Sequence, residues 1–378
     1  MTFPSTHKIY LHLARVMENY IVSARKYRPT EFDSVVGQAS ITRTLENAIK
    51  NHHLAQAFLF SGPRGVGKTT CARILAKRIN LEADKNLKED DDLSFNIFEL
   101  DAASNNSVDD IRHLNEQVRI PPQVGSYRVF IIDEVHMLSL SAFNAFLKTL
   151  EEPPPHAIFI LATTEKHKII PTILSRCQVF DFKRIEIDGI ISQLEKIAKS
   201  EKIEAEHDAL HIIAQKADGA MRDALSIFDQ LVSFCGKKLT YDDVIENLNV
   251  LDYDYYFKVG EAMLEGNIPS ALVLFNEVLQ KGFDGHNFIN GLSSHFRNLL
   301  VCKDVETLSL LEVGPTIQEK YKQQSKSIDT AVLLQALRIT AKCDVQYKLS
   351  KNQRLLVEVT LMQLCSVKSV LEKKKTLN

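Results

Sequence analysis

The chain has 378 residues and a formal net charge of −2. This length exceeds one typical hydrophobic core, so we expect two or three domains, and the near-neutral charge excludes a strong global attraction to nucleic acid. No apolar run is long enough to cross a bilayer and no signal-peptide pattern begins the chain, so we expect a cytoplasmic protein without membrane contact.

The first residues that belong to a motif follow Met17. Residues 1–16 carry no motif, and we expect them to form an extension outside the folded core, with Met17 as the natural start. From Tyr27 to Phe182, short apolar runs alternate with helical patterns, which is typical of a parallel sheet covered by helices. The expected strands cover residues 58–60, 96–100, 129–132, 158–162 and 179–182. The acidic stretch 82–92 predicts a mobile loop.

Residues 61–70, SGPRGVGKTT, fit the phosphate-binding pattern G-x-x-x-x-G-K-[ST]. A short apolar run at 57–60 precedes the pattern and a helical pattern at 71–79 follows it, which is the strand, loop and helix that the chemistry requires. We therefore expect a nucleoside-triphosphate site. Its residues are Gly62, Pro63, Arg64, Gly65, Val66, Gly67, Lys68, Thr69 and Thr70.

Two side chains of this loop have separate chemical roles. The free N–H groups and the positive end of the helix dipole would bind phosphate, and Lys68 would reach the outer phosphates as a catalytic residue. The Thr69 hydroxyl would bind a magnesium ion. The pattern therefore predicts a triphosphate and Mg²⁺ together.

Paired carboxylates end the apolar run 128–132. Asp133 and Glu134 follow it directly, and charged groups at the end of a buried strand are poor core residues. Taken without the phosphate loop, the two carboxylates would be explained by a strand end that faces solvent. Beside a phosphate-binding loop, we expect Asp133 to hold Mg²⁺ with Thr69 and Glu134 to polarise the attacking water.

Two threonines end the next expected strand. Ligands of an open α/β sheet bind at the carboxyl ends of its strands, so Thr163 or Thr164 would sense the γ-phosphate or the attacking water. A pair of β-favouring residues at a strand end explains the same pattern. We take Thr164 as the catalytic candidate.

Helical patterns replace the strand patterns beyond Lys183. Residues 190–200 and 209–216 are amphipathic, and a further helical region runs from about Asp252 to a long patterned stretch at 330–371. We expect an α/β domain at 17–185, a small helical domain at 186–249 and an all-helical domain at 250–378.

Together these motifs resemble the AAA+ clamp-loader ATPases, and among them the γ/τ family of bacterial DNA polymerase III. The resemblance covers about 20–367. It is carried by the phosphate loop and by 24–29 (ARKYRP), 35–38 (VVGQ), 99–104 (ELDAAS), 131–138 (IIDEVHML), 143–154 (FNAFLKTLEEPP) and 175–177 (SRC). It implies a P-loop AAA+ domain with a parallel sheet and helices on both faces, then a small helical lid and a helical collar.

The resemblance implies a nucleotide-binding role for four residues at the start of the domain. Tyr27, Arg28, Pro29 and Val36 would lie near adenine and ribose. Without the resemblance, an extended entry segment and ordinary core would explain them.

The resemblance also implies roles for three basic residues. Arg176 would be an arginine finger that enters the site of the adjacent subunit, where it would neutralise charge on the γ-phosphoryl oxygens. Arg222 would contact the γ-phosphate from a helix start, and Lys148 would touch the DNA backbone.

The implied function is an ATPase of the clamp-loader complex within the DNA-directed DNA polymerase III holoenzyme. It would use ATP and Mg²⁺ to load the sliding clamp onto primed DNA, in a ring with δ and δ′ subunits and further copies of itself. The chain resembles the short γ form, so contacts with helicase and polymerase have no support. Two alternatives stay open: a non-catalytic structural subunit of the clamp loader, and a hexameric AAA+ branch-migration helicase.

The sequence departs from the family in the interval 81–95. The family usually has a four-cysteine zinc module there, and this interval holds neither cysteine nor histidine. The six cysteines of the chain lie apart, without a C-x-x-C pair, which predicts reduced thiols and no zinc site.

We predict that the purified protein carries no zinc, because a tetrahedral site needs ligands that this interval lacks. Elemental analysis by mass spectrometry measures the zinc content directly. One zinc ion per chain would contradict the prediction.

Overall fold

The computed structural model describes residues 21–84, 87, 93 and 95–376. The expected extension at 1–16 and most of the expected loop at 82–92 lie outside the described residues. The described chain forms two compact units. The first contains the residues up to Lys202 together with Ile213–Ser233, and the second contains Ile203–Ile212 and the residues from Phe234 onward.

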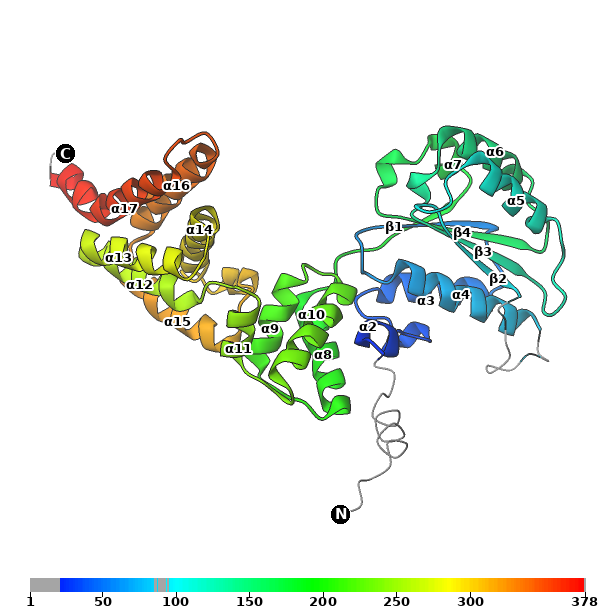
Figure 1. Ribbon diagram of the computed structural model, residues 1–378, viewed down its shortest axis with the longest axis horizontal. Helices are drawn as coiled ribbons and strands as arrows, with labels where there is room; N and C mark the ends of the chain where they lie inside the picture. The colour runs from blue at the N-terminus through cyan, green and yellow to red at the C-terminus, as the bar shows by residue number, and fades with distance from the viewer. Residues whose placement is uncertain (1–20, 85–86, 88–92, 94, 377–378) are drawn as a thin grey trace, which may run out of the picture. The chain divides into compact units, whose positions relative to one another are not determined.

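A five-stranded sheet forms the centre of the first unit (Figure 1). All its strands are parallel, in the order β2-β3-β4-β1-β5. The strands are β1 Ala57–Ser61, β2 Ile97–Asp101, β3 Arg128–Asp133, β4 Ala157–Thr163 and β5 Gln178–Asp181. Each expected strand is confirmed with ends displaced by one residue, because buried parallel strands are continuous apolar runs that sequence shows well.

Each face of the sheet supports a hydrophobic core, since successive strand residues point to opposite faces. Phe58 and Phe60 of β1 pack with α3 and α4, whereas Leu59 packs with α5, α6 and α7 on the other face. Figure 1 shows these helices on the two sides of the sheet. The predicted α/β architecture with helices on both faces is therefore confirmed.

The helices of this unit begin where the sequence provides caps. Ser107 and Asp110 form a capping box at α5, the Ser139 hydroxyl caps α6, and Pro171 is in the first turn of α7. The helices and the short 3₁₀ turns (η) between them are α2 Ser23–Lys26, η1 Phe32–Ser34, α3 Ala39–Lys50, α4 Lys68–Ala83, α5 Val108–Val118, η2 Val135–Met137, α6 Leu140–Glu151, η3 Lys166–Lys168, α7 Pro171–Leu174 and α8 Ile187–Glu201.

Helices dominate the chain beyond β5, as expected. They are α9 His207–Lys216, α10 Met221–Cys235, α11 Tyr241–Asn247, α12 Tyr253–Glu265, α13 Ile268–Gln280, α14 Gly285–Val301, η4 Glu306–Leu310, α15 Pro315–Ser327, α16 Thr330–Tyr347 and α17 Gln353–Thr376. The patterned stretch 330–371 is thus two helices that pack against each other. Buried aromatic rings fill the core of the second unit, with Phe257 and Tyr321 packed around the buried ring of His295.

One expectation for this region was wrong. Strand structure does not stop at Lys183, because β6 (Glu204–Ala205) and β7 (Lys238–Leu239) pair in parallel. Two residues are too few for an alternating pattern, so no periodicity indicates this pair of strands.

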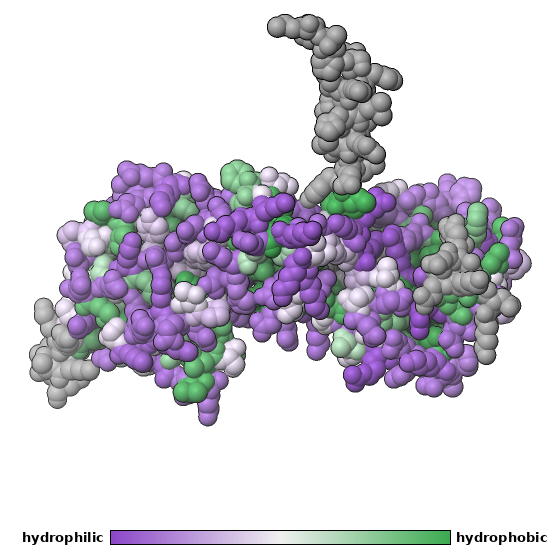
Figure 2. Space-filling model, turned by 90° about the horizontal axis from the view of Figure 1, so that it is seen from below, coloured by the Kyte–Doolittle hydropathy of each residue, from purple (hydrophilic) through white to green (hydrophobic). Residues whose placement is uncertain are grey.

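The surface view in Figure 2 shows apolar residues in scattered patches among hydrophilic ones. Among the described residues, no helix combines the length and apolar character needed to cross a membrane.

We predict that Phe159→Ala destabilises the first unit by about 3–5 kcal/mol, because it empties a fully buried site in the central strand. The Phe159 ring contacts Phe130 and Phe146, with centroids 5.6 and 5.3 Å away. Urea unfolding followed by circular dichroism measures the change. Leu140→Ala, at a side chain that is 67% exposed, is the control and should change little. Equal effects of the two substitutions would contradict the prediction.

Candidate nucleotide-binding site

The phosphate loop joins β1 to α4 with backbone conformations that favour glycine. Gly62 has a φ of 146°, and a side chain there would collide with the carbonyl oxygen of Phe182. Gly65 has a φ of 76°, and a Cβ there would lie 2.9 Å from the Ala220 Cβ. The loop therefore follows its course only because these positions lack side chains.

Lys68 is held inside this loop. Its Nζ donates hydrogen bonds of 2.7 Å to the carbonyl oxygens of Gly62 and Pro63, and the residue is 5% exposed. Burial lowers the pKa of Lys68, while the carboxylates of Glu134 and Asp133 act in the opposite direction. A phosphate anion beside Lys68 would favour the charged ammonium in the same way as these carboxylates.

Thr69 and Asp133 meet although they lie 64 positions apart in the chain. The Thr69 hydroxyl donates a hydrogen bond of 2.7 Å to Asp133 Oδ2. Asp133 is the last residue of β3, and Thr69 is in the first turn of α4. A hydroxyl and a carboxylate side by side match the oxygen ligands that Mg²⁺ prefers, so the two residues fit the ion predicted for them.

Glu134 directs its carboxylate toward the end of β4. Its Oε2 accepts hydrogen bonds from the Thr164 backbone N–H (3.2 Å) and from the Thr164 hydroxyl (3.0 Å). Its backbone has a φ of 46°, in the left-handed region, and its N–H donates to Asp133 Oδ1. Such a conformation costs roughly 1 kcal/mol or more in a residue other than glycine, and it often marks a functional site.

The two candidate threonines of β4 have different partners. Thr164 contacts Glu134, whereas the Thr163 hydroxyl lies 3.0 Å from His136 Nδ1 and accepts from the Glu165 N–H. Sequence reasoning gave His136 no role. The sequence could have indicated a role, since His136 closely follows the two carboxylates in the run 133–136.

A pocket of about 620 Å³ opens beside these groups. Its wall includes all four residues expected near adenine and ribose, together with Arg222 and loop residues 64–70. Gly62 and Pro63 do not line the pocket, and they contact Lys68 instead. Sequence reasoning missed further lining residues, namely Val22, Ala24, Arg25, Ser34, Val35, Asp101, Ile185, Gln193, Met221 and Leu225.

Several polar contacts fix the wall of the pocket. Arg28 Nε donates to the Thr70 hydroxyl at 3.1 Å, and burial lowers the pKa of Arg28. The Tyr27 hydroxyl bonds to Glu201 at the end of α8. The Arg222 N–H lies 3.4 Å from the Gly65 carbonyl oxygen. Residues 27–28 thus contact α4 and α8, and the start of α10 contacts the phosphate loop.

Arg176 and Lys148 lie outside this pocket. Arg176 donates hydrogen bonds of 2.6 Å to Glu151 Oε1 and to the Thr172 carbonyl oxygen, and its side chain is 33% exposed. Lys148 is exposed on α6. The structure therefore does not bring these two residues to the site of their own chain.

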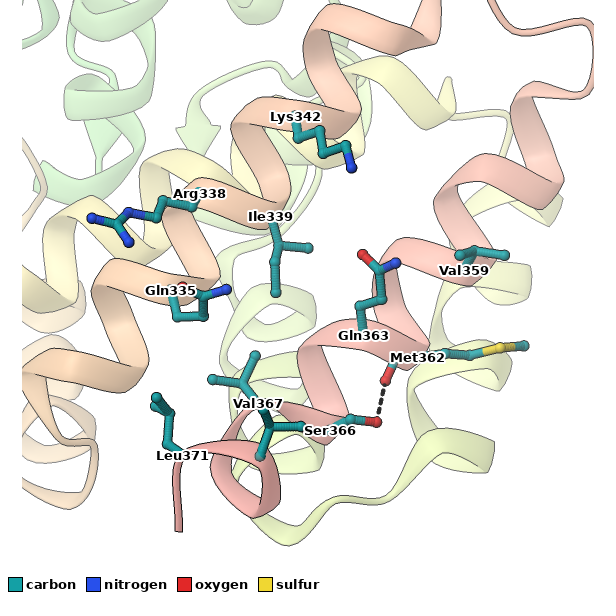
Figure 3. A pocket seen from close by; sticks show the side chains of 11 residues that line it. Gln335, Arg338, Ile339, Lys342, Val359, Met362, Gln363, Ser366, Val367 and Leu371 are labelled. Carbon is teal, nitrogen blue, oxygen red and sulfur yellow. Dashed lines mark hydrogen bonds between the residues drawn. The ribbon is translucent and has the colours of Figure 1, made fainter. Parts of the chain in front are cut away.

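A second hollow, of about 570 Å³, lies between α16 and α17 (Figure 3). Arg338 and Lys342 of α16 lie across from apolar side chains of α17 such as Val359 and Met362, and the Ser366 hydroxyl bonds to the Met362 carbonyl oxygen. Among the described side chains, its lining combines basic, polar and apolar groups.

Comparison with known proteins identifies the family. The DNA polymerase III subunit gamma of Buchnera aphidicola is 34% identical, in an alignment that covers 83% of this chain and 85% of that protein. The chain belongs to the family of DNA polymerase III gamma and tau subunits. The tau subunit of Bacillus subtilis is 41% identical over 92% of this chain and 63% of its own length, and that of Escherichia coli is 42% identical over 70% and 43%.

Three family models match successive parts of this gamma/tau chain. They describe the DNA polymerase III delta subunit (37–186), the clamp-loader subunit ATPase lid domain (189–237), and domain III of subunits gamma and tau (239–378). The predicted fold class and family are thereby confirmed. The chain spans less than two thirds of the length of the tau relatives it matches in Bacillus subtilis and Escherichia coli.

The solved structures that this chain matches include the Holliday junction branch migration motor RuvB of Thermotoga maritima. It is 21% identical, with a TM-score of 0.47, over 63% of this chain and 80% of that one. The clamp loader delta protein of Bacillus subtilis is 17% identical, with a TM-score of 0.37, over 86% and 99%.

Among the residues that the structure describes, no group of three His, Cys, Asp or Glu side chains could hold a metal ion. The absence of zinc stays a prediction, because part of the interval 81–95 lies outside those residues.

We predict that Gly65→Ala lowers ATP affinity by at least about tenfold, or about 1.4 kcal/mol. The added Cβ strains a left-handed residue and displaces the loop from Ala220. Binding of a fluorescent ATP analogue measures the loss.

Gly282→Ala is the matched control, since Gly282 has a similar φ of 85° and open space around its Cβ position. It should lose some stability and keep its affinity. Unchanged affinity in Gly65→Ala would contradict the prediction.

Proposed function

We propose that this chain is the ATP-hydrolysing motor subunit of a bacterial clamp loader, which loads the sliding clamp onto primed DNA. The observation that carries the proposal is the convergence of Lys68, Thr69, Asp133 and Glu134 at one pocket. These residues lie at the start of α4 and at the end of β3, on the carboxyl edge of the sheet, and membership of the gamma/tau family supports the same function.

The phosphate groups would bind at the start of α4. The N–H groups of the loop and the positive end of the helix dipole attract the anion, and Lys68 exchanges its two carbonyl partners for phosphate oxygens. Thr69 and Asp133 would hold Mg²⁺, which neutralises charge on the phosphates when bound. Tyr27, Arg28, Pro29 and Val36 would form the wall for adenine and ribose; Arg222 would reach the γ-phosphate.

Hydrolysis would be a direct attack of water on the γ-phosphorus. Glu134 accepts a proton from that water as the new P–O bond forms, and the bond between the γ-phosphorus and the β,γ-bridging oxygen breaks. ADP and phosphate are the products. Thr164 would hold Glu134 in place and sense the γ-phosphate from the end of β4.

Arg176 would act on the neighbouring subunit. It lies outside the pocket of its own chain, which supports a role in trans. To reach another site, its guanidinium has to break the hydrogen bond to Glu151 or move together with Glu151. A ring that contains δ and δ′ subunits and further copies of this chain would bring it there. Lys148 would touch the DNA that enters the ring.

We further propose the domain division 17–185 for the ATPase domain, 186–249 for the lid and 250–378 for the collar, with 1–16 outside the core. The lid and domain III models match residues close to the last two ranges, which supports the division. The proposed location of the protein is the cytoplasm.

The two alternative functions receive less support. A non-catalytic subunit has no need for the contacts that place Thr69, Asp133 and Glu134 together. A hexameric branch-migration helicase would assemble without δ and δ′, so the native mass of the assembly separates it from a clamp loader. The proposal itself is tested by ATP hydrolysis in the reconstituted complex, where clamp and primed DNA together should stimulate the rate, and an unchanged rate would contradict it.

We predict that Arg176→Ala lowers ATP turnover of the assembled ring by about 10³-fold or more, since a finger contributes 10³ to 10⁵ in comparable enzymes. ATP affinity of the isolated chain should stay the same, because the finger serves another site. Steady-state phosphate release measures turnover. Arg112→Ala is the matched control, at an exposed arginine paired with Asp109. An equal loss in both variants would contradict the prediction.

A further inference from the structure

His136 is a buried histidine beside the proposed base. It lies in η2, two residues after Glu134, and its side chain is 5% exposed. A buried imidazole needs partners for its ring nitrogens, because an unpaired polar group away from water is costly. Its partners are therefore informative about its role.

Both ring nitrogens face oxygen atoms of functional residues. Nδ1 lies 3.0 Å from the Thr163 hydroxyl and 3.4 Å from Glu134 Oε2. Nε2 lies 3.4 Å from Glu165 Oε1, and the Glu165 N–H donates to the same Thr163 hydroxyl. The ring thus bridges the segment after β3 and the segment after β4.

The two oxygens of the Glu134 carboxylate have different surroundings. Oε2 receives two hydrogen bonds from Thr164 and faces His136 Nδ1. Among the described residues, none donates a hydrogen bond to Oε1, while Glu134 lines the pocket. One oxygen is therefore anchored, which leaves the other for a water molecule in the pocket.

We propose that His136 is a positioning residue for Glu134. Thr163 holds the Nδ1 edge of the ring, and this edge together with Thr164 fixes Oε2 so that the remaining oxygen faces the attacking water. This inference rests on the proposed function, in which Glu134 is the base. A displacement of about 1 Å in a reacting group costs about 100-fold in rate, so loss of the ring should affect turnover far more than nucleotide binding.

Two amide substitutions separate the two edges of the ring. His136→Asn places an N–H₂ group near the position of Nδ1 and loses the group that faces Glu165. His136→Gln places the N–H₂ group near the position of Nε2 and loses the group that faces Glu134. A role in positioning Glu134 therefore predicts that His136→Asn restores turnover and His136→Gln does not.

The experiment measures ATP turnover of the full chain assembled with its partner subunits, together with the Kd for ATP. We expect His136→Ala and His136→Gln to lower kcat by about 10- to 100-fold with an unchanged Kd, and His136→Asn to keep most of the activity. His113→Ala, at an exposed histidine of α5, is the matched control and should behave as the unaltered chain.

Each other outcome overturns the inference. Wild-type turnover in His136→Ala would show that the ring is not needed, and restoration by His136→Gln alone would assign the role to the contact with Glu165. Equal losses of kcat and ATP affinity in all three variants would show a general structural role. If the unaltered assembly hydrolyses no ATP at all, the proposed function falls as well, and that result is distinct from the others.

Discussion

The hydrogen bond from Thr69 to Asp133 joins the start of α4 to the end of β3, and the geometry of the site depends on this junction. The two residues lie at the same edge of a parallel sheet, where the carboxyl ends of β1, β3 and β4 lie together. Hydrophobic packing on both faces of the sheet fixes the strands, so the polar groups at their ends have little freedom. The hydrophobic core of the sheet thus fixes the positions of the polar groups at this edge.

Much of the fold and of this edge could be predicted from the sequence. Buried parallel strands are short apolar runs, and the phosphate loop has fixed residue spacings, so the strands of the sheet and the places of Lys68 and Thr69 follow from local patterns. The pairing of β6 with β7 could not be predicted, since two residues show no periodicity. Gln193 and Leu225 were missed for another reason: they reach the pocket only through tertiary packing of α8 and α10.

The contacts of the carboxylates were also beyond sequence reasoning. Spacing alone indicates that Glu134 follows a buried strand, but it does not indicate that Thr164 holds one of its oxygens or that His136 lies against it. The same limit applies to Arg176, whose ion pair with Glu151 joins the helix α6 to the segment after α7. These contacts are set by the tertiary fold, since Glu134 and Thr164 lie 30 positions apart and Glu151 and Arg176 lie 25 positions apart.

We propose that the pocket of one chain is half of a catalytic site, with Glu134 on one subunit and Arg176 on the next. Mixing two inactive chains tests this most directly. Assemblies that contain both Glu134→Gln and Arg176→Ala chains would include interfaces with an intact glutamate on one side and an intact arginine on the other. We predict that such mixed assemblies recover part of the ATP turnover, whereas each variant alone stays inactive. No recovery in assemblies shown to contain both chains would contradict it.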